Sequence, residues 1–292
     1  MGVELGPGFK YHIVTISAIF FALTIGLVVG SVFVSPQFVN RQERLIGQLQ
    51  HTFNSDLAES RAEVARYKEC LETITPAALK GKLSNQNVII IETGDYPDDT
   101  LHVADAIGLA SPRVVSHLTI TPTLDRRAED LRRLFSDLQS RNPQFPSDRD
   151  ALFQQLASIL GHGDSLSSPT LPILEREEIV RLTADETYAA PVRVAIIVMG
   201  SRKTDSLRAT RVDSALIRAL LKQGITVVAC EGTGAASSDI PALRGLKGEI
   251  STVDNVDTNI GQCALVLAVS GPRGDYGVKQ GASRLLPTYP AP

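Results

Sequence analysis

The chain has 292 residues, which is enough for a membrane-spanning segment and a substantial soluble domain. Its formal net charge of −3 at pH 7 leaves no excess of basic residues, so we do not expect a nucleic-acid partner. The cysteines Cys70, Cys230 and Cys263 lie far apart and lack the paired spacing of a zinc site or a disulfide framework.

The first expected element is the uncharged apolar run 13–34, which follows a short tail of residues 1–12. As a helix it would extend about 33 Å, enough to cross a hydrocarbon core of about 30 Å. A cleaved signal peptide with a cleavage site at Val29-Gly30-Ser31 is the alternative, but its apolar region would be shorter, typically about 7–15 residues. A buried helix of a soluble domain is disfavoured because no polar face is present. We therefore predict a retained single-pass anchor in the cell membrane, with the lipid bilayer as a partner.

The charges that flank this run do not decide its orientation. Lys10 precedes it, and Arg41 and Arg44 follow it, so basic residues lie on both sides. Long domains cross a membrane largely regardless of their charge, which is compatible with a C-terminal part outside the cytoplasm. We expect an extracytoplasmic soluble domain, while charge alone leaves the orientation open.

Small residues recur every four positions along one face of the run. Ala18, Ala22, Gly26 and Gly30 share this face, and the two glycines form a Gly-x-x-x-Gly motif. Small side chains at this spacing allow two membrane helices to approach closely, although Ala and Gly are also common in membrane helices generally. We favour self-association through this face.

Residues 36–75 are expected to form a helical stalk that ends at Thr75-Pro76. Its apolar or near-apolar positions follow a heptad pattern with one added step between Phe53 and Leu57, which is a stutter. The alternative is a single amphipathic helix that lies on its own domain. We favour a parallel homodimeric coiled coil, because the pattern continues from a span that already suggests pairing. The positions expected to pair are Leu49, Phe53, Leu57, Val64 and Leu71.

Residues 83–292 show apolar strands alternating with helices. This alternation predicts an α/β fold with an open, mostly parallel, Rossmann-like sheet. Ser147 is the expected N-cap of the helix 147–160. A loop is expected to follow this helix at 161–172. The expected strands are 87–92, 114–120, 193–199, 225–230 and 263–269, and the expected helices are 98–109, 126–138, 147–160, 173–182, 213–223 and 239–243.

Motifs that would carry chemistry are weak throughout the chain. Gly232-Thr233-Gly234 follows a strand but lacks the third glycine of a dinucleotide loop, so a turn is the better interpretation. The sequence has two methionines and no close pair of histidines, which is a poor ligand set for Cu(I). A copper site within one chain is therefore not expected, a site shared between protomers stays open, and the metal-ligand residues are unknown. Asp254 and Asp257 are candidates for paired carboxylates and are equally well explained as turn residues. We expect neither enzymatic activity nor a cofactor.

The C-terminal part carries a family resemblance. Residues 251–258 (STVDNVDT), Gly261, the run 264–269 and residues 274–277 (GDYG) resemble the mycobacterial copper transport protein B family, as do Tyr11-His12 and the end of the span at residues 26–31. The resemblance implies an envelope protein with one N-terminal anchor, a stalk and an α/β domain outside the cytoplasm. It also implies a role in copper homeostasis or efflux, and it is the only indication of copper as a ligand. It supplies no catalytic or metal-ligand residues.

Two functions are therefore expected of this non-enzymatic protein. The first is the copper role that the resemblance implies. The alternative is a dimeric coiled-coil scaffold that binds and regulates an envelope partner, such as a cell-wall hydrolase in cell separation. In this second hypothesis the candidate recognition surface consists of Asp254, Asp257, Asp275 and Tyr276.

Overall fold

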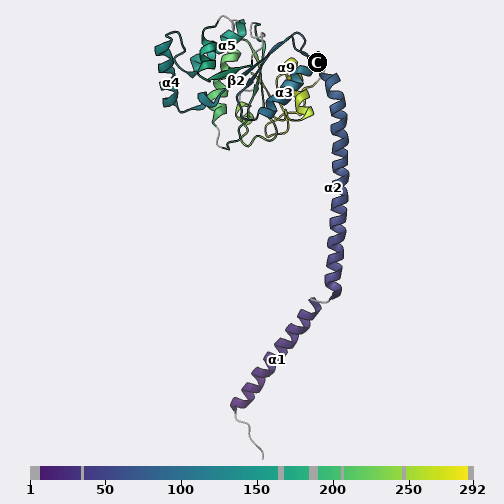
Figure 1. The fold of residues 1–292 in the computed structure, drawn as a ribbon. Helices are drawn as coiled ribbons and strands as arrows, with labels where there is room; N and C mark the ends of the chain where they lie inside the picture. The colour runs from purple at the N-terminus through teal and green to yellow at the C-terminus, as the bar shows by residue number, and fades with distance from the viewer. Residues whose placement is uncertain are drawn as a thin grey trace, which may run out of the picture. The chain divides into compact units, whose positions relative to one another are not determined.

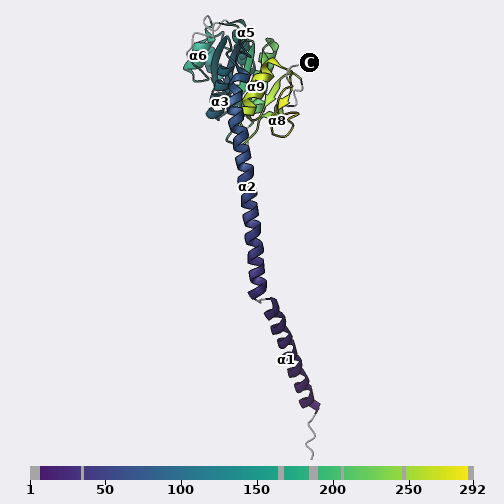
Figure 2. The same ribbon diagram turned by 90° about the vertical axis from the view of Figure 1, so that its right-hand side faces the viewer.

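The protein folds into two compact units, Met1–Tyr67 and Lys68–Pro292, each of which is described by itself. Figures 1 and 2 show the ribbon of the computed structural model in two views. The structure describes residues 7–33, 36–163, 168–183, 190–204, 207–244 and 248–288.

The apolar run forms helix α1 (Pro7–Phe33). Among the described residues it contains one segment long and apolar enough to cross a membrane, the 21 residues Tyr11–Ser31. The Thr15 and Thr24 hydroxyls donate hydrogen bonds of 2.8 and 2.7 Å to carbonyl oxygens one turn earlier in the helix. These hydroxyls are satisfied within the helix, so they do not oppose an apolar environment. The predicted helix is confirmed over residues 13–33, and its expected last residue lies outside the described part.

Helix α2 (Pro36–Leu79) is longer than expected and has 44 residues. The prediction that it ends at Thr75-Pro76 is wrong. Pro76 removes one N–H donor from the helix. Thr75 and Leu79 are nevertheless buried, at 4% and 1% exposure, and their packing holds the turn after Pro76 in place. The helix therefore ends one turn later, where the Lys80 amide donates to the Pro76 carbonyl at 3.1 Å.

A seven-stranded sheet forms the centre of the second unit, in the order β3-β2-β1-β4-β5-β6-β7. Every neighbouring pair is parallel except β2 and β3. The expected α/β class with a mostly parallel sheet is therefore confirmed. The strands are β1 (Asn87–Glu92), β2 (Val114–Ile120), β3 (Val180–Leu182), β4 (Val194–Val198), β5 (Thr226–Cys230), β6 (Ser251–Val253) and β7 (Asp275–Tyr276).

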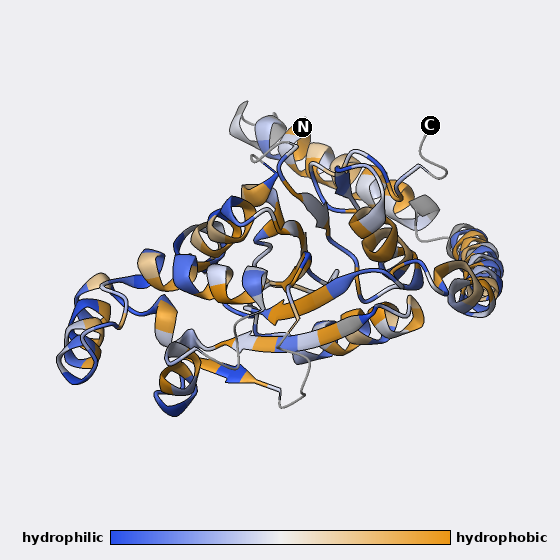
Figure 3. Cartoon of the chain, turned by 90° about the horizontal axis from the view of Figure 1, so that it is seen from above, coloured by the Kyte–Doolittle hydropathy of each residue, from blue (hydrophilic) through white to orange (hydrophobic). Residues whose placement is uncertain are grey.

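Helices cover both faces of this sheet, so the central strands are buried on both sides. One face packs against α3 (Pro97–Leu109), α9 (Asn259–Ser270) and the buried end of α2, and α3 and α9 lie side by side (Figures 1 and 2). Figure 3 shows the apolar strands enclosed between helices whose outer faces are more polar. The second face packs against α4 (Ala128–Arg141), α5 (Arg149–His162), α6 (Thr170–Arg176), α7 (Ser214–Lys222) and α8 (Ile240–Leu243).

The strand expected at 263–269 is instead part of helix α9, which corrects the prediction. The Thr258 hydroxyl caps this helix by accepting a 3.0 Å hydrogen bond from the Gly261 amide. A short apolar run that is buried all round has no period that separates a strand from a buried helix. The strand of this region is β6, which lies before the helix in a segment expected to form turns.

Two further expectations are corrected. Residues 173–182, expected to be one helix, form the end of α6 and the strand β3, and the loop expected to extend to residue 172 ends where α6 begins at Thr170. Glu178, whose φ of 50° is left-handed, lies between α6 and β3 and turns the chain. The N-cap of α5 is Asp148 rather than Ser147, because its carboxylate accepts a 2.9 Å hydrogen bond from the Ala151 amide.

Candidate functional site

The carboxyl ends of the parallel strands meet at one edge of the sheet. Strand order reverses between β1 and β4, since the chain passes from β1 to β2 on one side and later from β4 to β5 on the other. Open α/β sheets bind ligands in the crevice at such a switch point. The loops that follow β1, β4 and β5 therefore form the candidate site.

The loop after β5 is closed by carboxylates of the chain itself. The Gly232 amide donates to the Asp99 carboxylate at 2.8 Å, and the Thr233 amide donates to the Asp257 carboxylate at 2.8 Å. A Cβ atom at position 232 would overlap the Asp99 carboxylate, so a larger residue there would displace Asp99. Burial raises the pKa of Asp99, and the Gly232 hydrogen bond partly offsets this effect. Because these two amides already have anionic partners within the chain, they do not offer a phosphate cradle.

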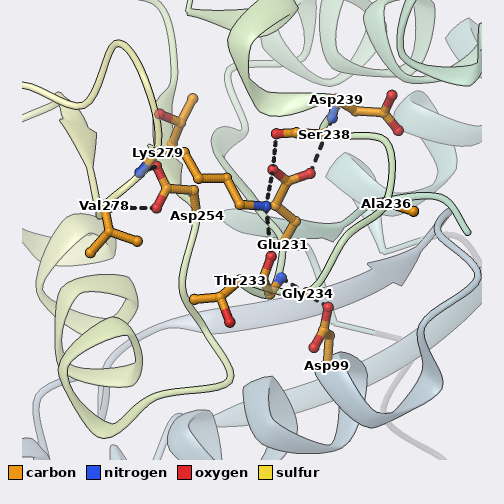
Figure 4. Close-up of polar contacts among 12 residues, drawn as sticks. Asp99, Glu231, Thr233, Gly234, Ala236, Ser238, Asp239, Asp254, Val278 and Lys279 are labelled. Carbon is orange, nitrogen blue, oxygen red and sulfur yellow. Dashed lines mark hydrogen bonds and ion pairs between the residues drawn. The ribbon is translucent and has the colours of Figure 1, made fainter. Parts of the chain in front are cut away.

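Glu231, which directly follows β5, lies in a buried ion pair. Its side chain is fully buried, and its carboxylate contacts the Lys279 ammonium at 2.9 Å (Figure 4). Lys279 also donates to the Gly232 carbonyl at 2.8 Å, while Glu231 accepts hydrogen bonds from the Ser238 hydroxyl and from the Asp239 amide. These contacts compensate the buried negative charge of Glu231. They also connect the end of β5 to Lys279, which lies 48 positions later in the chain.

Asp254 organises the C-terminal strap, which we define as residues 277–281. Its fully buried carboxylate accepts hydrogen bonds from the Val278 and Lys279 amides at 2.6 and 3.0 Å (Figure 4). The Arg244 guanidinium contacts the same carboxylate at 2.5 Å and also donates to the Tyr276 carbonyl at 3.3 Å. The strap is thereby held at the end of β6 by a charge-assisted network.

The candidate recognition surface of the sequence analysis must be corrected at two of its four positions. Asp254 and Tyr276 are 0% and 3% exposed, so their side chains do not form a contact surface. The reason is that β6 and β7 join the sheet, which places Asp254 beneath the strap and buries Tyr276 in the core. Asp257 and Asp275 are half-buried and accept hydrogen bonds from Thr233 and Thr252.

Two further buried carboxyl groups lie at this end of the sheet. Asp213, the last residue of the π-helical turn Ala209–Asp213, is fully buried, and burial raises its pKa to about 7. Burial also raises the pKa of Asp239 to about 6, with a further contribution from the negative charge of Glu231. The positive charge of Arg208 opposes both shifts. Single π-helical turns are frequent at functional sites.

A cavity of about 350 Å³ opens at the switch point between β1 and β4. It is lined by residues from the loops after β1 and β4, by η1 (Pro122–Asp125), which follows β2, and by the π-helical turn before α7. Its polar lining includes Asp95, Asp125, Ser201, Arg208 and Arg211.

The cysteines and Met199 do not gather into a soft-ligand site. Cys230 and Met199 are buried in the cores on opposite faces of the sheet, and burial raises the pKa of the Cys230 thiol. Cys70 is exposed, and Cys263 lies on α9, with its sulfur 3.6 Å from the Thr75 hydroxyl, rather than at the start of a strand. The described residues contain no cluster of three His, Cys, Asp or Glu side chains suited to a metal ion.

The residues expected to mediate pairing lie on α1 and α2. Within the described chain almost all of their side chains are exposed, and Leu71 is half-buried. Leu57, at 36% exposure, marks the stutter. This exposure leaves the small-residue face and the apolar seam available for a second helix, and pairing itself stays a prediction.

Several residues of this region were missed by sequence reasoning, including Asp99, Asp213, Glu231, Arg244 and Lys279. A signal was present for Glu231, because a charged residue directly follows a buried strand. The others are ordinary in their local sequence and become recognisable only when the strand order brings them together.

In the described part of the chain, the fold and this site define a class of protein with one helix suited to span a membrane, a long exposed helix and a mostly parallel α/β domain whose β5 loop is closed by its own carboxylates. The family described as "Copper transport outer membrane protein, MctB" matches residues 8–287, and the chain belongs to this family. The predicted resemblance is therefore confirmed.

Curated relatives agree with this assignment. The chain is 25% identical over 307 residues to proteins named "Copper transporter MctB" from Mycobacterium bovis (strain ATCC BAA-935 / AF2122/97) and Mycobacterium tuberculosis (strain CDC 1551 / Oshkosh). Each alignment covers 94% of this chain and 96% of the relative.

Proposed function

We propose that this protein is a non-enzymatic, membrane-anchored envelope protein that acts in copper homeostasis or efflux. The observation that carries the proposal is the family match over residues 8–287, supported by relatives that are named copper transporters. The apolar helix Tyr11–Ser31 supports a single-pass anchor, with the α/β domain outside the cytoplasm.

A single span per chain constrains how copper would be handled. Polar passage through lipid needs a cavity lined by protein, and one isolated helix does not enclose such a path. We therefore infer that this protein acts on copper through an assembly or through a partner in the envelope.

The alternative is a dimeric scaffold that regulates an envelope partner, such as a cell-wall hydrolase. The observation that favours it is the exposed apolar seam of α2, which includes Leu49, Phe53 and Val64 at 69%, 66% and 62% exposure. At 1.5 Å per residue a helix of this length extends about 66 Å, so it would offer a long surface for a partner helix.

One experiment tests the copper role and separates it from the scaffold. A strain lacking the protein is expected to accumulate copper, and the full chain should restore the normal copper content. The variant Leu57→Asp/Val64→Asp places charges in the exposed seam and should fail to restore it if the protein acts through an assembly. Intracellular copper and cell separation are both measured.

The outcomes of this experiment are distinct. Normal copper content in the deletion strain contradicts the copper role. Defective cell separation with normal copper content would favour the scaffold. Full rescue of both properties by the seam variant would show that the seam is only a spacer. Tight stoichiometric Cu(I) binding by the purified full chain would argue for direct rather than indirect handling.

Association through α1 is expected to depend on Gly26 and Gly30. A Cβ atom at either position would meet no atom of the same chain within 4 Å, so Gly26→Ile/Gly30→Ile leaves the packing of the single chain unchanged. Because the added side chains would separate two closely packed helices, we expect a loss of dimer of about tenfold or more. The measurement is crosslinking of Leu49→Cys in membranes, in a Cys70→Ser background.

The matched control is Val28→Ile, which adds bulk on the opposite side of the same helix. It should leave the crosslinked dimer unchanged. Equal crosslinking in the glycine variant and the control would contradict pairing through the small-residue face.

A further inference from the structure

The cavity at the switch point between β1 and β4 has the size and place of a small-molecule site. Its volume of about 350 Å³ lies within the range of about 300–1,000 Å³ that is typical of ligand pockets. It is formed where three parallel strands end, so its walls are held by the sheet rather than by one surface loop.

One wall of the cavity is preorganised by Asp95. Its carboxylate accepts a 2.7 Å hydrogen bond from the Arg202 amide and a 3.3 Å hydrogen bond from the Ser201 hydroxyl. The same Ser201 oxygen accepts from the Lys203 amide at 3.1 Å. Asp95 therefore fixes the loop after β4, and its negative charge is directed at this loop.

Two arginines one turn apart also line the cavity. Arg208 is 8% exposed, and its guanidinium donates a 2.7 Å hydrogen bond to the Ile120 carbonyl, which fixes its orientation. Arg211 is exposed and forms no ion pair with any carboxylate in the described part of the chain. Arginine guanidinium groups match the geometry of carboxylate and phosphate oxygens.

A third feature is an acceptor without a partner. The Oδ1 atom of Asp125, which also lines the cavity, is buried and receives no hydrogen bond from the described residues. A buried carboxylate oxygen without a donor is costly, and a ligand hydroxyl or amine would satisfy it.

We propose that this cavity binds a small organic oxyanion that also carries hydroxyl or amine groups. The oxyanion contacts Arg211, and a donor group of the ligand contacts Asp125. A dinucleotide is not the ligand, because the amides of the β5 loop are taken by Asp99 and Asp257. The site is independent of the copper role.

Calorimetric titration of the full-length protein in detergent micelles tests this proposal. The probes are glycerol phosphate, glycerate and glycerol, which share hydroxyl donors and differ in the anionic group. We expect one saturable site for glycerol phosphate or glycerate, or for both, and none for glycerol. The comparison of the two anions tells whether phosphate or carboxylate is preferred.

Variants locate the site. Arg211→Gln should weaken binding about tenfold by removing one charge-assisted contact. Asp125→Asn should weaken glycerol phosphate binding more than binding of inorganic phosphate, which lacks the hydroxyl donors of glycerol. The control Arg218→Gln removes an exposed positive charge two turns further along the same helical segment, outside the cavity lining, and should have no effect. The proposal is overturned if neither anion binds saturably, or if Arg218→Gln weakens binding as much as Arg211→Gln.

Discussion

Replacing Asp254 with Ala is expected to lower the free energy of unfolding of the α/β domain by about 3–5 kcal/mol, the cost of breaking a buried ion pair. The substitution removes the carboxylate nearest to the Arg244 guanidinium, which is 6% exposed. It also removes the acceptor for the Val278 and Lys279 amides, so the C-terminal strap loses its main attachment to β6. Denaturant unfolding of the full chain in micelles, followed by circular dichroism, measures the loss.

Hydrogen exchange gives a second and local measurement. Peptides that contain the strap should exchange much faster in Asp254→Ala than in the wild type, while peptides of β1 should change less. The matched control is Asp275→Ala, because Asp275 is 26% exposed and lies 3.9 Å from the Arg244 Nε atom. We expect it to cost about 1 kcal/mol, as for a partly exposed pair. Equal losses in the two variants would contradict the central role of Asp254.

The buried carboxyl groups Asp213 and Asp239 are expected to make the protein less stable as the pH rises. Their folded-state pKa values, about 7 and about 6, lie above the ordinary value of 3.8. The folded state therefore holds protons that the unfolded chain releases. The resulting stability is fully present below about pH 4 and is lost as the pH rises to about 7. For Asp213 the change is on the order of 4 kcal/mol, at about 1.4 kcal/mol per pKa unit.

Asp213→Asn tests this sign. Asparagine resembles the protonated carboxyl group and does not ionise, so the variant should be more stable than the wild type at pH values above 7 and should show a weaker pH dependence. Thermal unfolding from acidic to mildly alkaline pH gives the comparison. The control Asp105→Asn, at an exposed position of α3, should follow the wild type. A loss of stability in Asp213→Asn that is the same at every pH would contradict the prediction.

Local pattern was enough to predict much of this protein from its sequence. Helix α1, the strands β1 and β2 and the α/β class follow from uncharged or β-branched apolar runs of sufficient length. The family also followed from short motifs near both ends of the chain, and the match over residues 8–287 confirms it. These features depend on neighbouring residues, which determine hydrophobic periodicity and the lengths of elements.

Tertiary structure decided the rest. Residues 263–269 form a helix because Thr258 caps it and the sheet buries it, whereas their apolar run fits a strand equally well. Glu231 meets Lys279, and Asp254 meets Arg244, only because β5, β6 and β7 are neighbours in the sheet. The cavity between β1 and β4 likewise depends on the reversal of strand order. The pKa values and partners of these charged groups are set by burial and by contacts between distant segments, and no local sequence pattern contains that information.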